Sequence, residues 1–313
     1  KTHTMIPTRD HFQNFVRYRK ANLGYESCDY EGTCWDFFSS KANAQWIDND
    51  YFCFGTYPFM DGHAFGFFKL KGGTQENQQE AWAQIRAQYV GPLYGPINGS
   101  TFLPYKFISM TDGSPIFPGE WDNAPSVAQF FNACQPKKVV KYRSAYRTYY
   151  DGVIEVSESF LQDWYDQVFS LEYMEISSPG TPEALLNMID SIFKGNWGYE
   201  SMTKDQFHYW LKHMTDGSGN TPLLYWVQIK DQKVGFAYLS ELPDATIIFK
   251  TIGILPEFQA KGLGNAIAGQ LHKIAKSRNA QKCIYALVQV DNRVNRMPDP
   301  DITIMRQYET YIF

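Results

Sequence analysis

Two glycines in the run from Gln259 to Gly264 have the spacing of a turn that can hold phosphate groups. The run reads Gln-Ala-Lys-Gly-Leu-Gly, with its glycines at 262 and 264. Glycine has no side chain to hold a ligand away, so consecutive backbone N–H groups at a helix start can point at phosphate oxygens. The positive end of the helix dipole lies at the same place. The run therefore predicts a pyrophosphate site.

A strand and an amphipathic helix are expected on either side of this turn. The segment 246–254 is apolar and β-branched apart from Lys250, which predicts a strand. After the turn, apolar residues recur at spacings of four, four and three, which predicts a helix with one apolar face: Leu263, Ile267, Leu271 and Ile274. Two glycines after a proline also suit an ordinary loop, but the elements on both sides favour the phosphate site.

The order of the glycines separates this turn from one that binds NAD. A dinucleotide-binding turn reads G-x-G-x-x-G and is followed about 20 residues later by an acidic residue. Here that position falls among Cys283, Ile284 and Tyr285. NAD is therefore disfavoured.

The turn resembles the coenzyme A loop of the GNAT acyltransferase superfamily, which has the form Q/R-x-x-G-x-G/A. The segments 222–229 and 233–239 predict a hairpin similar to the family's second and third strands, and 284–290 is similar to its fifth. The resemblance covers about residues 168–313. It implies an α/β (α+β) fold in which a mixed, mostly antiparallel twisted sheet is flanked by helices.

The same resemblance implies acetyl-CoA or another acyl-CoA as substrate, held by a strand end, the loop and a later asparagine. The coenzyme-binding residues expected on this basis are Ile252, Gly253, Ile254, Gln259, Ala260, Lys261, Gly262, Leu263, Gly264, Asn265 and Asn292. In the family's chemistry, an amine attacks the thioester while backbone N–H groups, here near Gly253 and Ile254, hold its oxygen.

The amine must lose a proton and the leaving thiolate must gain one. Candidate bases are Glu200 and Glu241, with Asp291 as a third, although each also suits a surface carboxylate. Many family members have a tyrosine seven residues after the asparagine, and it serves as the acid for the leaving thiolate. In this sequence that position is Asp299. Tyr308, on the expected last strand, is the candidate acid, and core packing is the alternative role.

Two further groups are candidates for contacts with the substrates. Lys250 interrupts an apolar strand beside the expected thioester position, so it points either to the site or to a solvated edge. In GNAT proteins the region between the first two helices borders the acceptor pocket. Here Asn196, Trp197 and Tyr199 are the expected acceptor-binding residues, unless the aromatic rings simply cover the core. Thr203 and Gln206 predict a capping box at the next helix.

The amino-terminal half repeats the order strand, helix, strand. Strands are expected at 51–55 and 64–70, a helix at 75–89 and a turn-rich strand region at 91–101. This half resembles a second, degenerate GNAT-like unit, because it lacks Q-x-x-G-x-G and carries Glu76 and Glu80 at the start of its helix. We expect domains at 1–155 and 156–313, with coenzyme A bound only in the second.

Composition and charge exclude several classes of protein. Of 313 residues, 44% are hydrophobic and 17% aromatic, which excludes disorder as the main state. The net charge of -4 and pI near 5.9 argue against a nucleic-acid partner. No apolar run predicts a membrane span, and no signal peptide opens the chain, so a cytoplasmic protein is expected. The five cysteines match no zinc pattern, and no metal is expected.

Three functions fit these observations. The first is an N-acyltransferase that acts on a small-molecule or peptide amine. The second is a tandem relative of the aminoacyl-tRNA-dependent transferases, which the negative net charge disfavours because tRNA binding requires a basic surface. The third is a non-catalytic protein that senses acyl-CoA. The sequence favours the first, and it leaves the acceptor and the oligomeric state open.

Overall fold

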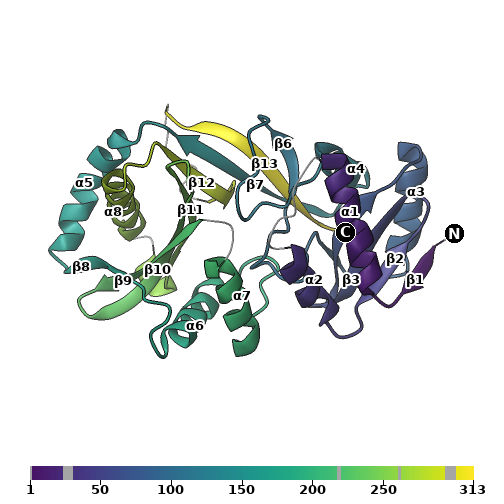
Figure 1. The fold of residues 1–313 in the computed structure, drawn as a ribbon, viewed down its shortest axis with the longest axis horizontal. Coiled ribbons are helices and arrows are strands. Elements are labelled where there is room, and N and C mark those ends of the chain that lie inside the picture. The colour runs from purple at the N-terminus through teal and green to yellow at the C-terminus, as the bar shows by residue number, and fades with distance from the viewer. Residues whose placement is uncertain (1, 24–30, 217–219, 260–261, 293–300) are drawn as a thin grey trace. The chain divides into compact units, whose positions relative to one another are not determined.

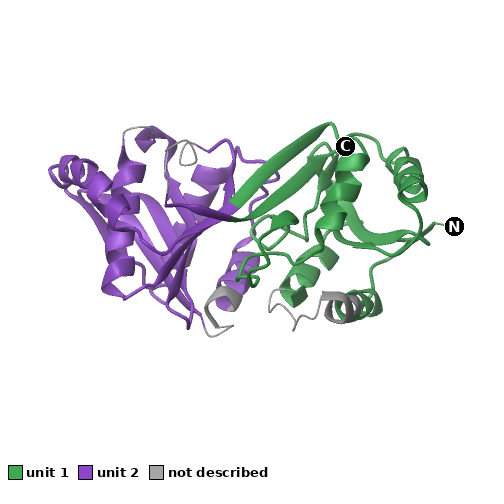
Figure 2. Cartoon of the chain, turned by 90° about the horizontal axis from the view of Figure 1, so that it is seen from above, with its two compact units in different colours: residues 1–143, 305–313 green, residues 144–304 purple. Residues whose placement is uncertain are grey.

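The chain divides into two compact units in the computed structural model, which describes residues 2–23, 31–216, 220–259, 262–292 and 301–313. Unit 1 comprises residues 1–143 and 305–313, and unit 2 comprises 144–304 (Figure 2). The chain thus passes between the units inside two strands, β7 (Lys138–Arg147) and β13 (Thr303–Ile312). The expected domains, 1–155 and 156–313, differ from these units in two places. The first boundary lies inside β7, and residues 305–313 belong to unit 1 because β13 pairs with β5 and β6.

Unit 1 is built on a mixed sheet with the strand order β1-β2-β3-β4-β5-β13-β7, and β6 also pairs with β13. The β4–β5 pair is parallel, and the pairs β1–β2, β2–β3, β3–β4, β5–β13 and β6–β13 are antiparallel. The strands are β1 (His3–Met5), β2 (Gln45–Asp48), β3 (Phe52–Phe59), β4 (Gly62–Leu70), β5 (Leu93–Gly95), β6 (Phe107–Thr111) and β13 (Thr303–Ile312). The helices are α1 (Arg9–Leu23), α2 (Glu31–Ser39), α3 (Gln75–Arg86) and α4 (Pro125–Ala133) (Figure 1).

Aromatic side chains fill the core of unit 1. Phe65, Phe68, Trp82 and Phe131 are each at most 5% exposed, and the Phe68 and Phe131 rings meet edge to face with their centroids 4.6 Å apart. Each such pair adds about 0.5–1.5 kcal/mol beyond the burial of its area. The rings join α3 and α4 to β4, so much of the chain's aromatic content serves packing.

Unit 2 is built on a sheet with the strand order β7-β12-β11-β10-β9-β8. The β11–β12 pair is parallel, and β8–β9, β9–β10 and β10–β11 are antiparallel. The strands are β8 (Phe169–Tyr173), β9 (Thr221–Ile229), β10 (Gln232–Glu241), β11 (Thr246–Ile254) and β12 (Lys282–Gln289). The helices are α5 (Asp151–Tyr165), α6 (Thr181–Phe193), α7 (Lys204–Asp216) and α8 (Leu263–Ser277), with a 3₁₀ turn at Pro256–Phe258. The predicted fold class, a mixed and mostly antiparallel sheet flanked by helices, is confirmed.

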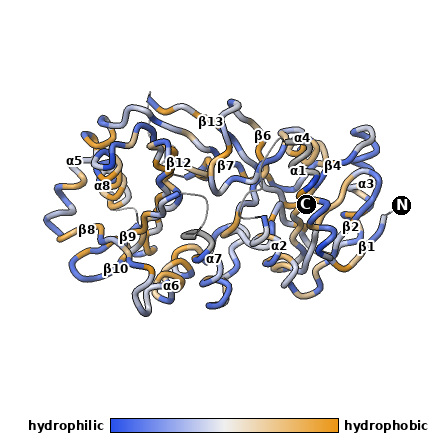
Figure 3. Tube along the Cα trace, in the orientation of Figure 1, coloured by the Kyte–Doolittle hydropathy of each residue, from blue (hydrophilic) through white to orange (hydrophobic). Residues whose placement is uncertain are grey.

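Helices cover both faces of the unit 2 sheet. The hydrophobic residues of β10–β12 and of one side of α8 form a single buried cluster. Figure 3 shows the hydropathy of each residue along these strands and this helix. α5 packs closely on α8, because a Cβ on Gly269 would lie only 2.4 Å from Ser157 Cβ. Ion pairs at 2.8 Å between Lys276 and Asp151 and at 2.7 Å between Lys273 and Glu158 border this contact. α6 lies on the opposite face, where Phe193 packs on Phe236.

The helix starts in unit 2 show what local sequence decides. Gln206 N–H donates to Thr203 Oγ1 at 3.2 Å and Thr203 N–H to Gln206 Oε1 at 3.0 Å, so the predicted capping box is confirmed.

None of the helices in the described ranges is both long enough and apolar enough to cross a membrane.

Candidate active site

The start of α8 leaves backbone donors open. Gly262 is the N-cap residue with a φ of 79°, in the left-handed region that glycine adopts without strain. Its carbonyl accepts the N–H groups of Asn265 and Ala266 at 3.0 and 3.2 Å. No side chain of the described residues caps the helix, and its first turn has no acidic residue. Within the described part of the chain, the N–H groups of Leu263 and Gly264 have no partner.

The strand that leads to this helix has an open edge. Parallel pairing joins residues 246–249 of β11 to 282–285 of β12, whereas β11 continues to Ile254 and β12 to Gln289. The described residues beyond Phe249 and Tyr285 form no further pairs between the two strands. Ile252 is accordingly 38% exposed although it lies inside a strand. The sheet therefore splays at residues 250–254, next to the start of α8.

Backbone alternation decides which amides of β11 face the open edge. Leu255 N–H donates to the Val234 carbonyl of β10 at 2.9 Å. Because successive residues of a strand direct their N–H groups to opposite sides, Gly253 N–H points to β10. The N–H groups of Ile252 and Ile254 therefore point to the open edge. Of the two residues expected to hold the thioester oxygen, Ile254 therefore directs its N–H group to the open edge, whereas Gly253 directs its N–H group to β10.

Gln259 is tied to the same edge. Its Nε2 donates to the Ile254 carbonyl at 2.8 Å. A Cβ on Gly264 would lie 3.9 Å from Ile254 Cδ1, which places the first turn of α8 beside the end of β11. The structure therefore brings Ile254, Gln259 and Gly264, three of the predicted coenzyme-binding positions, together where the strand ends and the helix begins.

The corresponding helix of unit 1 is closed to an anion. Thr74 caps α3, and its Oγ1 accepts the Asn77 N–H at 3.3 Å. Glu76 occupies the second position of α3, where α8 has Gly264. A hydroxyl cap takes up an open donor, and a carboxylate in the first turn repels phosphate.

The edge of β4 in unit 1 is filled by the chain itself. Ile97 N–H donates to the Phe65 carbonyl at 2.7 Å, and Asn98 Oδ1 accepts the Phe67 N–H at 2.8 Å. A Cβ on Gly66 would lie 2.2 Å from the Ile97 carbonyl oxygen. The amides that face an open edge in unit 2 thus have partners from the same chain in unit 1.

A family model matches the part of the chain that contains this site. Residues 183–296 match the model of the acetyltransferase (GNAT) family. This part of the chain is therefore identified as a GNAT acetyltransferase domain. The match covers α6 to the end of β12 and includes both the open edge of β11 and the start of α8. No curated protein matches the chain.

Solved GNAT structures share the fold of the whole chain at low identity. A GCN5-related glucosamine N-acetyltransferase region of a fungal multi-domain GH3 β-N-acetylglucosaminidase superposes with a TM-score of 0.58 at 11% identity, covering 100% of this chain and 38% of that one. A GCN5-related N-acetyltransferase from Anabaena variabilis gives 0.55 at 11%, covering 100% and 72%. A tandem GNAT protein from the clavulanic acid biosynthesis pathway gives 0.53 at 9%, covering 100% and 98%. The chain therefore spans well under half of the first of these proteins, and it has the two-unit fold of the third.

Lys250 occupies a β-bulge in the GNAT domain. Tyr238 pairs with Thr251 and Leu239 pairs with Phe249, so Lys250 is the extra residue of β11. A bulge bends the strand and changes the direction of a side chain. The Lys250 side chain is half-buried and stands two residues before Ile252.

Glu241 lies at the wrong end of its strand to act as the base. It pairs with Ile247, whereas the open edge is next to Gly235, which pairs with Ile254. Six residues of strand separate these positions by about 20 Å. Arg278, which follows α8, donates to Glu241 through Nε at 3.0 Å and also through Nη2. The geometry thus gives Glu241 a structural ion pair.

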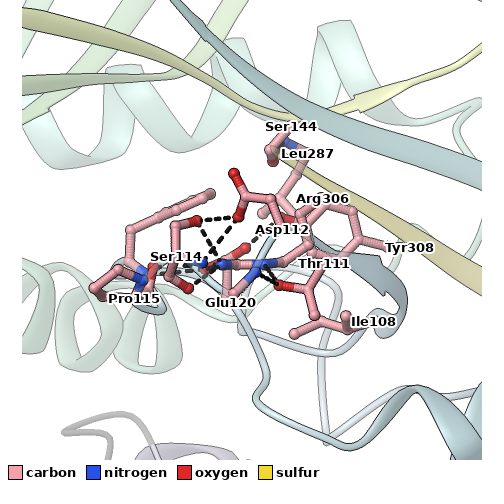
Figure 4. Close-up of polar contacts among 12 residues, drawn as sticks. Ile108, Thr111, Asp112, Ser114, Pro115, Glu120, Ser144, Leu287, Arg306 and Tyr308 are labelled. Atoms are coloured by element: carbon pink, nitrogen blue, oxygen red, sulfur yellow. Dashed lines mark hydrogen bonds and ion pairs between the residues drawn. The ribbon is translucent and has the colours of Figure 1, made fainter. Parts of the chain in front are cut away.

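Tyr308 is buried in unit 1 within a network of charged groups (Figure 4). Its hydroxyl donates to Glu120, which also accepts from Arg306, and both members of this ion pair have 0% exposed side chains. Burial raises the pKa of the Glu120 carboxyl, while Arg306 and the Tyr308 hydroxyl act in the opposite direction. This setting supports the core-packing role of Tyr308 that the sequence had left as the alternative to an acid.

The loop after α6 follows a helix that touches the open strand. A Cβ on Gly253 would lie 3.1 Å from Ile192 Cδ1 near the end of α6. In the loop, Asn196 and Glu200 are exposed and Trp197 is half-buried. Tyr199 donates to Asp190, which also accepts from Ser201 at 2.8 Å. Burial and the hydrogen bond to Asp190 raise the pKa of Tyr199 above its usual value, so this ring braces the loop as a neutral phenol.

The remaining predicted residues have simpler settings. Asn265 is half-buried in the first turn of α8. Asn292 is exposed directly after β12, where its N–H donates to the Gln289 carbonyl at 2.9 Å. Asp291 is exposed beside it. Ala260 and Lys261 lie outside the described residues.

Sequence reasoning missed a polar pair under the point where the strands part. His272 Nδ1 lies 2.6 Å from the Ala268 carbonyl and Nε2 lies 2.6 Å from the Tyr285 hydroxyl. Because a carbonyl only accepts, Nδ1 carries the proton and Nε2 accepts from the phenol. Burial lowers the His272 pKa to about 4. The only feature of the sequence that could have indicated a buried histidine was its place on the apolar side of α8, one residue after Leu271.

Proposed function

We propose that this chain transfers an acetyl or other acyl group from acyl-CoA to an amine of a small molecule or peptide, by direct attack in a ternary complex. One observation carries the proposal: the first turn of α8 has open N–H groups, a left-handed Gly262 and no acidic residue, while α3 has both a cap and a glutamate. Open donors at a positive helix end fit a diphosphate. We infer that only unit 2 binds the coenzyme.

The open edge of β11 suits the reacting carbonyl. In this chemistry the amine nitrogen bonds to the thioester carbon, the carbon–sulfur bond breaks, and one amine proton ends on the departing sulfur or on solvent. The N–H groups of Ile252 and Ile254 are our proposed donors to the thioester oxygen, because they face that edge. Fixed donors of this kind stabilise the negative charge that develops on the oxygen better than water does, because they need not reorient during the reaction.

The loop after α6 is the proposed acceptor region. Asn196, Trp197 and Tyr199 would contact the acceptor. Glu200 is our preferred candidate base over Asp291, because it is exposed in a loop that follows the helix lying on Gly253. In this proposal the Glu200 carboxylate accepts the proton of the ammonium directly or through an ordered water.

A substitution at the second position of α8 tests the proposal. Gly264→Glu gives α8 the residue that α3 has there, and among the described residues the nearest atom to a Cβ at this position is Ile254 Cδ1 at 3.9 Å. We expect calorimetry with coenzyme A to show at least about a tenfold loss of affinity, since each 1.4 kcal/mol of lost interaction is tenfold. Gln75→Glu, which adds the same charge at the start of α3, is the matched control and should bind as the unchanged chain does.

Release of free thiol from acetyl-CoA in the presence of an amine library then separates catalysis from sensing. Binding without acceptor-dependent thiol release would support the sensor instead of the transferase. If the unchanged chain failed to bind coenzyme A at all, the proposal would be wrong.

A further inference from the structure

β12 turns away from the sheet at a residue with an unusual backbone. Leu287 has a φ of 57°, in the left-handed region that residues with a side chain rarely enter. It lies two residues after Tyr285, the last residue of β12 that pairs with β11. A strand that is distorted in this way bends and twists more strongly. The conformation of Leu287 therefore coincides with the place where the two strands part.

A single side chain from the neighbouring strand satisfies the backbone there. Leu287 N–H donates to Ser144 Oγ at 2.9 Å (Figure 4). Ser144 lies in β7 and is 0% exposed. A regular ladder would give this N–H a backbone carbonyl, and a buried N–H without an acceptor is strongly disfavoured. Because the serine hydroxyl accepts this hydrogen bond, β12 can leave the regular ladder without leaving the Leu287 N–H group unpaired.

The alternative arrangement would close the open edge. If β12 continued beside β11 past Tyr285, its carbonyls would compete for the outward N–H groups of Ile252 and Ile254. These are the same donors that the proposed function requires to be open. The geometry assigns Ser144 the role of a positioning residue: we propose that it holds β12 away from β11 and so keeps the thioester-binding amides available. This inference rests on the proposed function.

Unit 1 uses the same kind of contact with the opposite result. Phe67 of β4 has a φ of 51°, and its N–H donates to a side-chain oxygen, Asn98 Oδ1, at 2.8 Å. There the acceptor comes from the segment that fills the edge of β4, next to Ile97. In unit 2 the acceptor comes from β7, so the edge of β11 stays open. The source of the side-chain acceptor distinguishes the two units.

Removal of the hydroxyl tests the inference. Ser144→Ala should weaken acetyl-CoA binding about threefold to tenfold, the loss expected for one hydrogen bond. Amide hydrogen exchange should slow at Ile252 and Ile254, because β12 then pairs with β11. Leu287→Gly on the Ser144→Ala background should restore binding, since glycine adopts a positive φ without strain. Ser170→Ala, on the exposed part of β8, is the control and should change neither readout.

The outcomes separate this inference from the proposed function. Unchanged affinity and unchanged exchange in Ser144→Ala would overturn the role of Ser144. A failure of Leu287→Gly to restore either readout would also overturn it, because the effect of Ser144→Ala would then be a general loss of packing, which glycine does not repair. If the unchanged chain binds no coenzyme A, the proposed function fails, and the exchange of Ile252 and Ile254 still decides whether Ser144 holds the strands apart.

Discussion

At the residue scale, the bulge in β11 places one positive charge near the amides proposed to hold the thioester oxygen. Lys250 is the extra residue of that bulge. Lys250→Met keeps the length of the stem and removes the charge, and we expect kcat/KM for acetyl-CoA to fall about tenfold, which corresponds to about 1.4 kcal/mol of transition-state stabilisation. Steady-state kinetics check this, with Lys230→Met in the exposed β9–β10 turn as control. Equal kcat/KM in both variants would remove Lys250 from the mechanism.

His272 makes the stability of the protein depend on pH. Burial lowers its folded-state pKa to about 4, whereas an unfolded histidine titrates near 6.5. Between these values the unfolded chain binds a proton that the folded chain does not, so the free energy of unfolding falls as the pH is lowered from about 6.5 to about 4. The slope is about 1.4 kcal/mol per pH unit, and the total loss is of the order of 3 kcal/mol.

Urea unfolding of the parent chain and of His272→Gln at several pH values between 7 and 4 measures this term. The parent should lose more stability than the variant over that window, because carboxylates contribute equally to both. Parallel curves would show that His272 is not held neutral in the folded state.

At the element scale, β13 is fixed to the segment between β6 and α4 by buried charges. Arg306 contacts Glu120 and the carbonyl and hydroxyl of Ser114, and its Nε lies 3.3 Å from Thr111 Oγ1. Phe117 N–H also donates to Glu120, at 2.8 Å. Loss of one partner leaves the other charge buried and uncompensated.

We expect Arg306→Met to lower the free energy of unfolding by about 3–5 kcal/mol, and Tyr308→Phe by about 1–3 kcal/mol because Glu120 loses one donor. The double variant Arg306→Met/Glu120→Gln should lose less than the sum of its single variants, since the two residues are coupled. Denaturant unfolding measures all of these. Tyr308→Phe should keep the kcat of the parent and its pH profile; loss of the alkaline limb of that profile would restore Tyr308 as an acid.

Local sequence predicted the elements well where a short-range pattern determines them. The hairpin β9–β10, the strand β11 and the helix α8 follow from alternation and from the spacing of apolar residues. At α6, by contrast, the pair Thr181-Pro182 has the residue types of an N-cap followed by a first helical proline. The structure instead has Gly180, with a φ of 82°, as the N-cap residue. The glycine reaches a left-handed turn that a threonine would resist.

At the scale of the whole molecule, the limits of sequence reasoning are set by contacts between distant residues. The pairing of β13 with β5 and β6 joins residues about 200 apart in the chain, and no local pattern specifies it. The bulge at Lys250 and the left-handed Leu287 depend in the same way on neighbouring strands. For the site, the loop and strand were readable as motifs, whereas the filling of the unit 1 edge by Asn98 required the folded chain.

Two related units in one chain allow a test with an internal control. Hydrogen exchange of the intact protein, with and without acetyl-CoA, reports on both strand edges and both helix starts in one experiment. We expect protection by the ligand at Ile252, Ile254, Leu263 and Gly264, whose N–H groups face the open edge or the open helix start. Phe67 and Asn77 of unit 1 should not respond, because Asn98 and Thr74 already accept their N–H groups. Calorimetry should give one coenzyme A per chain. Two per chain, or protection of Phe67, would show that unit 1 binds the coenzyme despite its filled edge and capped helix.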